Sequence, residues 1–184
     1  MGHSQADKAR NRERILTEAA ARIRRDGLES VSVAGLMESV GLTHGGFYNH
    51  FVSRTELLEE ALKQALALGV QNRRKDSGAG TARDDFEAFV RGYLSPAHRD
   101  HPESGCAIAA LVSEVGHGEA GLKATMSAQV EGLIATATKA LGSERDGMLA
   151  VSALIGALAL SRVCTDRERS DALLRTVREG LSRL

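Results

Sequence analysis

Residues 33–58 read VAGLMESVGLTHGGFYNHFVSRTELL, and this stretch decides the fold. Its first eight residues have apolar side chains at the i, i+3, i+4, i+7 spacing of one helical face: Val33, Leu36, Met37 and Val40. Ser32 is the expected N-cap of this helix, and Gly41 is the expected glycine that ends it. Thr43 then begins a further helix over 44–50. Two short helices joined by a tight turn predict a helix-turn-helix.

The two faces of the second helix differ in character. Phe47 and Phe51 are four residues apart, so they share a face that should pack on the preceding helices. The opposite face has residues that suit a DNA groove: His44, Gly45, Tyr48 and Asn49. Asparagine pairs bidentately with adenine, while tyrosine and histidine contact phosphates. The alternative is a small helical bundle with a solvated polar face, although two adjacent glycines cost it about 1 kcal/mol each.

The N-terminal segment is basic, whereas the whole chain has a formal net charge of zero. Seven basic residues and two acidic ones lie between positions 8 and 25. We expect Lys8, Arg10 and Arg12 to form an arm near DNA, because positive charge attracts the phosphate backbone. Arg22, Arg24 and Arg25 are expected on a solvated face of a helix over 7–26.

The rest of the chain is predicted to be helical as well. Ser53 and Glu56 form a capping box that begins a long helix, and Thr165 and Glu168 form another before the last helix. Pro96 is expected to close a helix and to begin a loop over 96–105. The chain has 3% aromatic residues and two prolines, which favours an all-α protein of about nine helices. We predict an N-terminal domain over 1–54 and a C-terminal domain over 55–184.

Residues 41–58 resemble the signature of the TetR/AcrR family of transcriptional regulators. That signature reads glycine, an apolar residue, serine or threonine, variable residues, aromatic-Tyr-x-His-Phe, then Ser-Lys/Arg and Leu-Leu. Residues 14–20 resemble the first helix of the family, with one extra residue. The resemblance implies a three-helix DNA-binding domain followed by a helical domain for effector binding and dimerisation. It also implies a homodimeric repressor that binds a near-palindromic operator in double-stranded DNA and is released by a small molecule. No cofactor is implied.

The resemblance also assigns roles to individual residues. Thr43, Tyr48 and His50 would hold phosphates, and Gly45 and Asn49 would face bases. Arg54 stands where the family usually has lysine and would bind phosphate. The full predicted DNA-binding set is Lys8, Arg10, Arg12, Ser32, Thr43, His44, Gly45, Tyr48, Asn49, His50 and Arg54.

An effector pocket is expected inside the C-terminal helices. Its predicted wall consists of Phe86, Phe89, Tyr93, Cys106, Leu111, Met126, Val130, Leu133 and Ile155, and each of these is also a plausible core residue. Cys106 lies at a predicted helix N-terminus, where the helix dipole stabilises a thiolate, so it is the best candidate sensor of electrophiles or oxidants. The alternative is a small buried side chain. The histidines and cysteine of 98–117 match no common zinc spacing, so no metal site is predicted.

The resemblance implies that the last two helices form the dimer interface. The predicted interface residues are Leu154, Leu158, Leu173, Val177 and Leu181. The alternatives to an effector-released repressor are an activator and a DNA-binding dimer without an effector. An enzyme is disfavoured, because the chain has no Ser-His-Asp order, paired-carboxylate motif or phosphate loop. Two cysteines and a charged N-terminus without a secretory signal indicate the cytoplasm, and the uncharged run 148–161 is too short to span a membrane.

Overall fold

The computed structural model describes residues 5–75 and 80–184, with side chains for all of these except 68–75. Every regular element in these ranges is a helix, which confirms the predicted all-α class. The first five are α1 (Gln5–Asp26), the short 3₁₀ helix η1 (Leu28–Ser30), α2 (Val33–Ser39), the 3₁₀ helix η2 (His44–Asn49) and α3 (Arg54–Lys75). The others are α4 (Ala82–Tyr93), α5 (Pro96–Asp100), η3 (Pro102–Ser104), α6 (Ala107–His117), α7 (Ala120–Leu141), α8 (Glu144–Val163) and α9 (Arg167–Leu181).

The turn after α2 has the geometry that its glycine predicts. Ser32 caps α2 by accepting a hydrogen bond from the Gly35 N–H at 3.2 Å. Gly41 adopts a left-handed φ of 70°, which favours glycine. The N–H of Leu42 donates to the Met37 carbonyl, and the N–H of Gly41 donates to the Glu38 carbonyl. This pair of bonds is a Schellman motif, and it turns the chain sharply toward η2.

The second helix of the motif is a 3₁₀ helix, whereas the sequence pattern predicts an α-helix. Gly45 and Gly46 weaken α-helical structure, and the segment is short enough for the tighter winding. The expected division of faces is still present. Phe47 and Phe51 are buried and stacked, with ring centroids 5.5 Å apart, while the residues predicted on the opposite face are exposed.

Two predictions for the C-terminal part are wrong. The expected loop over 96–105 contains α5 and η3, because Pro96 is the first residue of α5 and Ser95 caps it by accepting from the His98 N–H. The last helix is capped by Asp166, which accepts from the Arg169 N–H, and not by Thr165. Ser53 does cap α3, whereas Glu56 accepts from the N–H of Val52, one residue before the cap.

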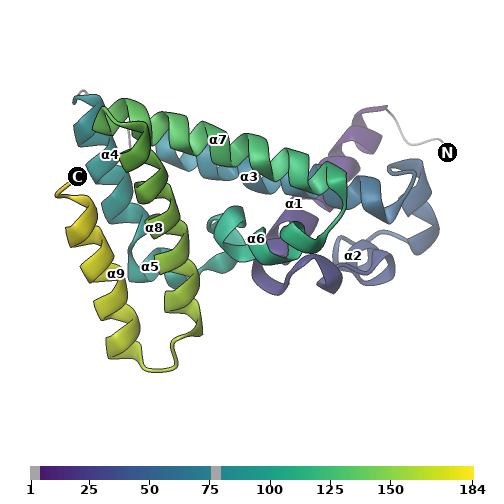
Figure 1. Ribbon diagram of the computed structural model, residues 1–184. Coiled ribbons are helices and arrows are strands. Elements are labelled where there is room, and N and C mark those ends of the chain that lie inside the picture. The colour runs from purple at the N-terminus through teal and green to yellow at the C-terminus, as the bar shows by residue number, and fades with distance from the viewer. Residues whose placement is uncertain (1–4, 76–79) are drawn as a thin grey trace.

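The helices form an elongated molecule with the helix-turn-helix at one end and the C-terminus at the other (Figure 1). The long helices α3 and α7 pack along each other, α1 packs directly on α3, and α6 contacts all three. One apolar core joins α1–α3 to α6 and the start of α7, so the first domain does not have a core of its own. A second core joins α4, the end of α7, α8 and α9.

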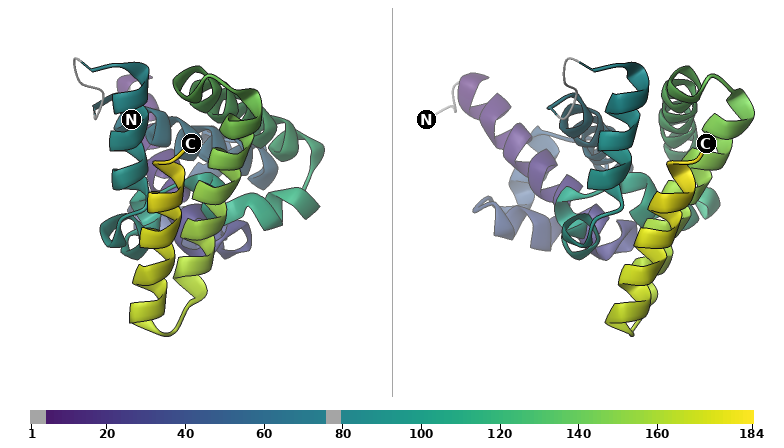
Figure 2. Two further views of the ribbon diagram at one scale, coloured as in Figure 1. Left: turned by 60° about the vertical axis from the view of Figure 1, so that its left-hand side comes forward. Right: turned by 90° about the vertical axis from the view of Figure 1, so that its left-hand side faces the viewer.

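Helices α8 and α9 form an antiparallel pair on one outer side of the molecule (Figure 2). By length and composition alone, α8 is the one described helix that could cross a membrane. In this fold one side of α8 packs on α7 and α9 through Ala150, Val151 and Leu154.

Candidate nucleic-acid interface and ligand cavity

The exposed face of η2 is the most distinctive polar surface of the N-terminal end. Thr43, His44, Gly45 and Asn49 are exposed, and Tyr48 has 67% of its surface accessible. The Tyr48 ring is held edge-on against buried Phe47, with centroids 5.3 Å apart. This packing directs a rigid ring outward. The Thr43 hydroxyl makes no capping bond, so it is available to a partner.

His50 lies at the border between this surface and the core. Its Nδ1 is buried and has no hydrogen-bond partner among the described residues. Burial lowers the pKa of His50, and the nearby charges of Lys8 and Arg12 lower it further. The imidazole is therefore neutral near pH 7 in the free protein.

Two predicted phosphate ligands are engaged inside the protein. Arg54 donates to the carbonyl groups of Val31 and Leu28, both at 2.9 Å, and so fixes η1 against α3. Arg12 forms an ion pair with Glu60 at 2.5 Å and lies 4.8 Å above the Phe51 ring. Both guanidinium groups therefore have a structural role that the sequence pattern does not reveal.

The predicted basic arm is helical. Lys8 and Arg10 belong to the first turns of α1, not to an extended segment, and both are exposed. Arg10 lies 3.5 Å from Asp7 in an exposed pair, which contributes little to stability. Ser32, the remaining predicted contact, is exposed at the start of α2.

Val52 was missed by the sequence reasoning. It follows His50 and Phe51 directly and has 86% of its surface accessible. An apolar side chain exposed beside the η2 surface is suited to contact a thymine methyl group. The exposure of Val52 could have been predicted from its position, because Phe47 and Phe51 fill the inward face and Val52 lies outside their spacing.

A cavity of about 430 Å³ lies between α3, α4, α6, α7 and α8. Six of the nine predicted pocket residues line it: Phe86, Phe89, Tyr93, Cys106, Leu133 and Ile155. The other three do not, because Leu111, Met126 and Val130 pack in the core around α1, α3 and α6. The wall is mostly apolar, and it has a few polar groups, among them Gln129, Thr136 and Lys139.

One end of the cavity is organised by His98. Its Nδ1 lies 2.7 Å from the Tyr93 carbonyl and its Nε2 accepts from the Cys106 N–H at 3.0 Å, which requires the proton on Nδ1. Burial lowers the pKa of His98, so the ring is neutral. Cys106 is the N-cap residue of α6 and is partly buried. Arg24 and Arg162 are close enough to interact electrostatically with the Cys106 side chain.

Both ring nitrogens of His98 are thus engaged in hydrogen bonds. Among the described residues, no group of three or more histidine, cysteine or acidic side chains is arranged to hold a metal ion.

The two parts of the molecule are tied together at η1. The Glu114 carboxylate of α6 accepts a hydrogen bond from the Leu28 N–H at 2.8 Å. Gly27 allows this approach, because a Cβ there would lie 2.7 Å from a Glu114 oxygen. Arg24 is not on a solvated face as predicted: it is 5% exposed and donates to the Glu103 carbonyl at 2.7 Å and to the Ala65 carbonyl.

Three predicted dimer residues are buried within the single chain. Leu154 and Leu181 belong to the core of α4, α7, α8 and α9, Leu158 is fully buried, and Leu173 and Val177 are partly buried against that core. The exposed side of α8 instead consists of Leu149, Ser152, Leu160 and Val163. The apolar pattern identified the helices but could not separate the inner from the outer face.

Residues 15–61 match the family model for bacterial regulatory proteins, tetR family. A search of curated protein sequences finds no match. Among solved structures, the chain resembles the reduced form of E. coli NemR, with 19% identity, a TM-score of 0.81 and coverage of 95% of this chain and 96% of that one. It also resembles a TetR transcriptional regulator from Chloroflexus aurantiacus, with 20% identity, a TM-score of 0.80 and coverage of 97% and 96%. A TetR-family regulator from Cytophaga hutchinsonii has 15% identity, a TM-score of 0.81 and coverage of 99% and 98%.

The resemblance to the TetR family is thereby confirmed, by the matched segment in the N-terminal region and by the fold along nearly the whole chain. The family model over residues 15–61 describes bacterial regulatory proteins, and the solved structures show the fold.

Proposed function

We propose that the protein is a homodimeric transcriptional repressor that binds a near-palindromic DNA operator and is released by a small-molecule effector. The observation that carries the proposal is the η2 surface, where Tyr48 and Asn49 are exposed on a helix whose other face is locked in the core. The proposed domains are 1–54 for DNA binding and 55–184 for effector binding and dimerisation, in the cytoplasm and without a membrane partner.

In this proposal η2 enters the major groove. Asn49 and Gly45 face the base edges, and Thr43, Tyr48 and His50 contact phosphates. Lys8 and Arg10 bring positive charge to the flanking backbone. Ser32 and His44 complete the contact surface, whereas Arg12 and Arg54 act mainly by holding α1 and η1 in place.

The dimer is proposed to form through the outer faces of α8 and α9. Leu149, Gly156, Leu160 and Val163 lie along one side of α8, and no atom of the described residues outside this helix lies within 4 Å of a Cβ added at Gly156. Gly180 of α9 is equally open. Small residues between exposed leucines allow a second pair of helices to approach closely. A two-fold axis here would place two η2 helices on one face of the duplex, about one DNA turn apart.

The effector is proposed to occupy the 430 Å³ cavity, whose volume and mostly apolar wall suit a small molecule. Cys106 lines this cavity at the start of α6, so a thiol-reactive compound is one candidate class. A shift of α6 would reach the DNA-binding domain through Glu114 and Leu28. The effector must bind the two states with different affinities to change the DNA-bound population.

A reporter promoter that contains the bound site tests this function. We expect the wild-type protein to lower transcription and Asn49→Ala to restore it. Raised transcription would indicate the alternative, an activator. Unchanged transcription, with binding shown in parallel, would contradict a regulatory role. An effector-independent DNA-binding dimer would repress transcription to the same extent with and without added thiol-reactive or apolar compounds.

A further inference from the structure

A second cleft of about 620 Å³ lies outside the apolar cavity. It is bounded by the end of α1, by α5, by the outer side of α6 and by the junction of α8 and α9. Unlike the first cavity it is rich in charge. Its walls contain five arginines, Arg24, Arg25, Arg99, Arg162 and Arg167, and three carboxylates, Asp26, Asp100 and Glu114.

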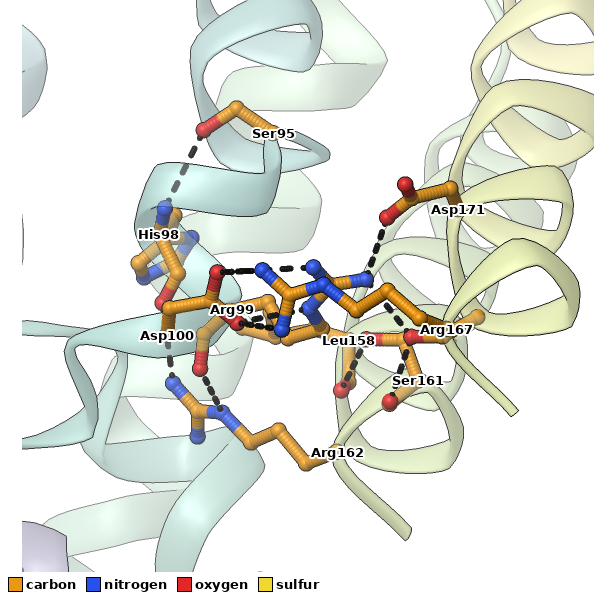
Figure 3. Close-up of polar contacts among 10 residues, drawn as sticks. Ser95, His98, Arg99, Asp100, Leu158, Ser161, Arg162, Arg167 and Asp171 are labelled. Carbon is orange, nitrogen blue, oxygen red and sulfur yellow. Dashed lines mark hydrogen bonds and ion pairs between the residues drawn. The ribbon is translucent and has the colours of Figure 1, made fainter. Parts of the chain in front are cut away.

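Three of the five arginines are neutralised by carboxylates. Arg25 pairs with Asp26 at 2.8 Å. Arg99 is 4% exposed and pairs with Asp100 at 2.8 Å and with Asp171 at 2.5 Å, and Arg167 also pairs with Asp100 (Figure 3). These two arginines lower the pKa of Asp100 to about 2, so its charge is fixed.

Arg24 and Arg162 have a different environment. Arg162 donates to the carbonyl groups of His98 and Arg99, both at 3.3 Å, and Figure 3 shows its guanidinium directed at the α5 backbone. Arg24 donates only to carbonyl groups as well. Neither forms an ion pair with a carboxylate among the described residues, and Glu103 acts on both only through space. Burial lowers the pKa of both, so each positive charge is poorly compensated.

Each guanidinium group also has one nitrogen atom that could donate a hydrogen bond to a ligand. Nη2 of Arg24 and Nη1 of Arg162 make no hydrogen bond to the described residues. The carbonyl bonds hold both side chains in fixed positions at the cleft wall. A pair of fixed, partly desolvated guanidinium groups is the arrangement that binds oxyanions most strongly.

We propose that this cleft is a second ligand site, which binds a small oxyanion, a phosphate or a carboxylate, between Arg24 and Arg162. The ligand would pair with the two guanidinium groups that form no ion pair among the described residues. It would also connect α1 of the DNA-binding domain to α8 of the proposed dimer face, through the end of α1 and the α5–η3 segment. The site is separate from the apolar cavity, so it does not depend on what that cavity binds.

Calorimetric titration of the full-length protein with inorganic phosphate tests this site. The buffer is free of other oxyanions, and sodium chloride keeps the ionic strength constant. We expect saturable binding to the wild type, and an affinity weakened roughly tenfold or more in Arg162→Gln, which removes charge-assisted hydrogen bonds. A parallel titration with acetate separates the two sources: stronger binding of phosphate indicates a phosphate-bearing ligand, and stronger binding of acetate a carboxylate.

The matched control is Arg145→Gln, which removes an arginine from the same helix at an exposed position with 84% of its side chain accessible. It should bind both anions as the wild type does. Arg162→Lys keeps the charge but loses the planar fork, and we expect intermediate affinity with an unchanged melting temperature. The absence of saturable binding of either anion to the wild type would overturn the proposal. Equal binding to the wild type and to folded Arg162→Gln would overturn it as well.

Discussion

In the proposed complex, recognition of the DNA sequence depends most on Asn49. It is exposed on the η2 face. Asn49→Ala should weaken binding to the preferred operator by about 1–3 kcal/mol and relax the preference at one base pair of each half-site. Tyr48→Phe should instead weaken binding to all duplexes alike, because a phosphate contact is independent of sequence. Titrations of an operator and a scrambled duplex measure the difference. Equal losses on both duplexes for Asn49→Ala would contradict its role.

His50 predicts a pH dependence of DNA binding. Its pKa is lowered in the free protein, chiefly by burial, and a DNA phosphate at the ring would raise it again. The complex then holds a proton that the free protein lacks, so affinity increases as the pH falls toward and below 6.5. Affinities measured across this range should lose that component in His50→Gln. His117→Gln, a change at the exposed end of α6, is the control and should keep it.

At the scale of elements, the bond between α6 and η1 is the clearest link between the two halves. Glu114→Ala removes the acceptor of the Leu28 N–H. We expect this amide to exchange hydrogen several times faster, with little change in global stability, because the carboxylate is exposed. Hydrogen exchange followed by NMR measures it. Glu119→Ala, at the start of α7, serves as control, and unchanged exchange at Leu28 in Glu114→Ala would show that α6 does not hold η1.

The attachment of α5 to α9 depends on Arg99. This guanidinium is buried and bonds Asp100, Asp171 and the Ser170 hydroxyl. Arg99→Ala leaves Asp171 without its cation and the Ser170 hydroxyl without its donor, while Asp100 keeps Arg167, so the free energy of unfolding should fall by about 3 kcal/mol. Denaturant unfolding compares it with Arg145→Ala, an exposed change that should cost little. Similar stabilities for the two variants would contradict a structural role for the network.

Local signals predicted the helix-turn-helix well because they act within a few residues. The glycine at 41 and the phenylalanines at 47 and 51 determine the turn and the buried face through contacts close in sequence. Pro96 was ambiguous, because proline both ends a helix and suits the first turn of the next. Arg24 and Arg54 could not be placed from sequence, since their partners are backbone carbonyls that only the tertiary fold brings near.

At the scale of the whole molecule, apolar periodicity identified helices but not their neighbours. Leu111 and Leu133 are both apolar positions on amphipathic helices, yet one fills the core near α1 and the other lines the cavity. The same limit explains the dimer prediction: Leu158 is buried inside the chain, whereas Leu160 on the same helix is 56% exposed. The assignment of a face depends on the packing of all helices together.

The proposed dimer interface predicts that a charged substitution on the exposed side of α8 weakens dimerisation. Leu160→Glu would bury a carboxylate from each subunit in an apolar contact, so the dissociation constant of the dimer should rise by about two orders of magnitude. Sedimentation velocity over a range of concentrations measures it. Val112→Glu makes the same change at an apolar residue of α6 with similar exposure, and it should remain dimeric. A dimer that tolerates Leu160→Glu as well as the control would place the interface elsewhere.

The central claim is that a dimer of this chain reads DNA through η2. Selection of bound duplexes from a random pool, followed by sequencing and titration at two salt concentrations, tests it most directly. The account predicts an enriched near-palindrome with half-sites about one turn apart and an affinity that falls steeply with salt. A pool that remains random, with weak binding at both salt concentrations, would contradict it.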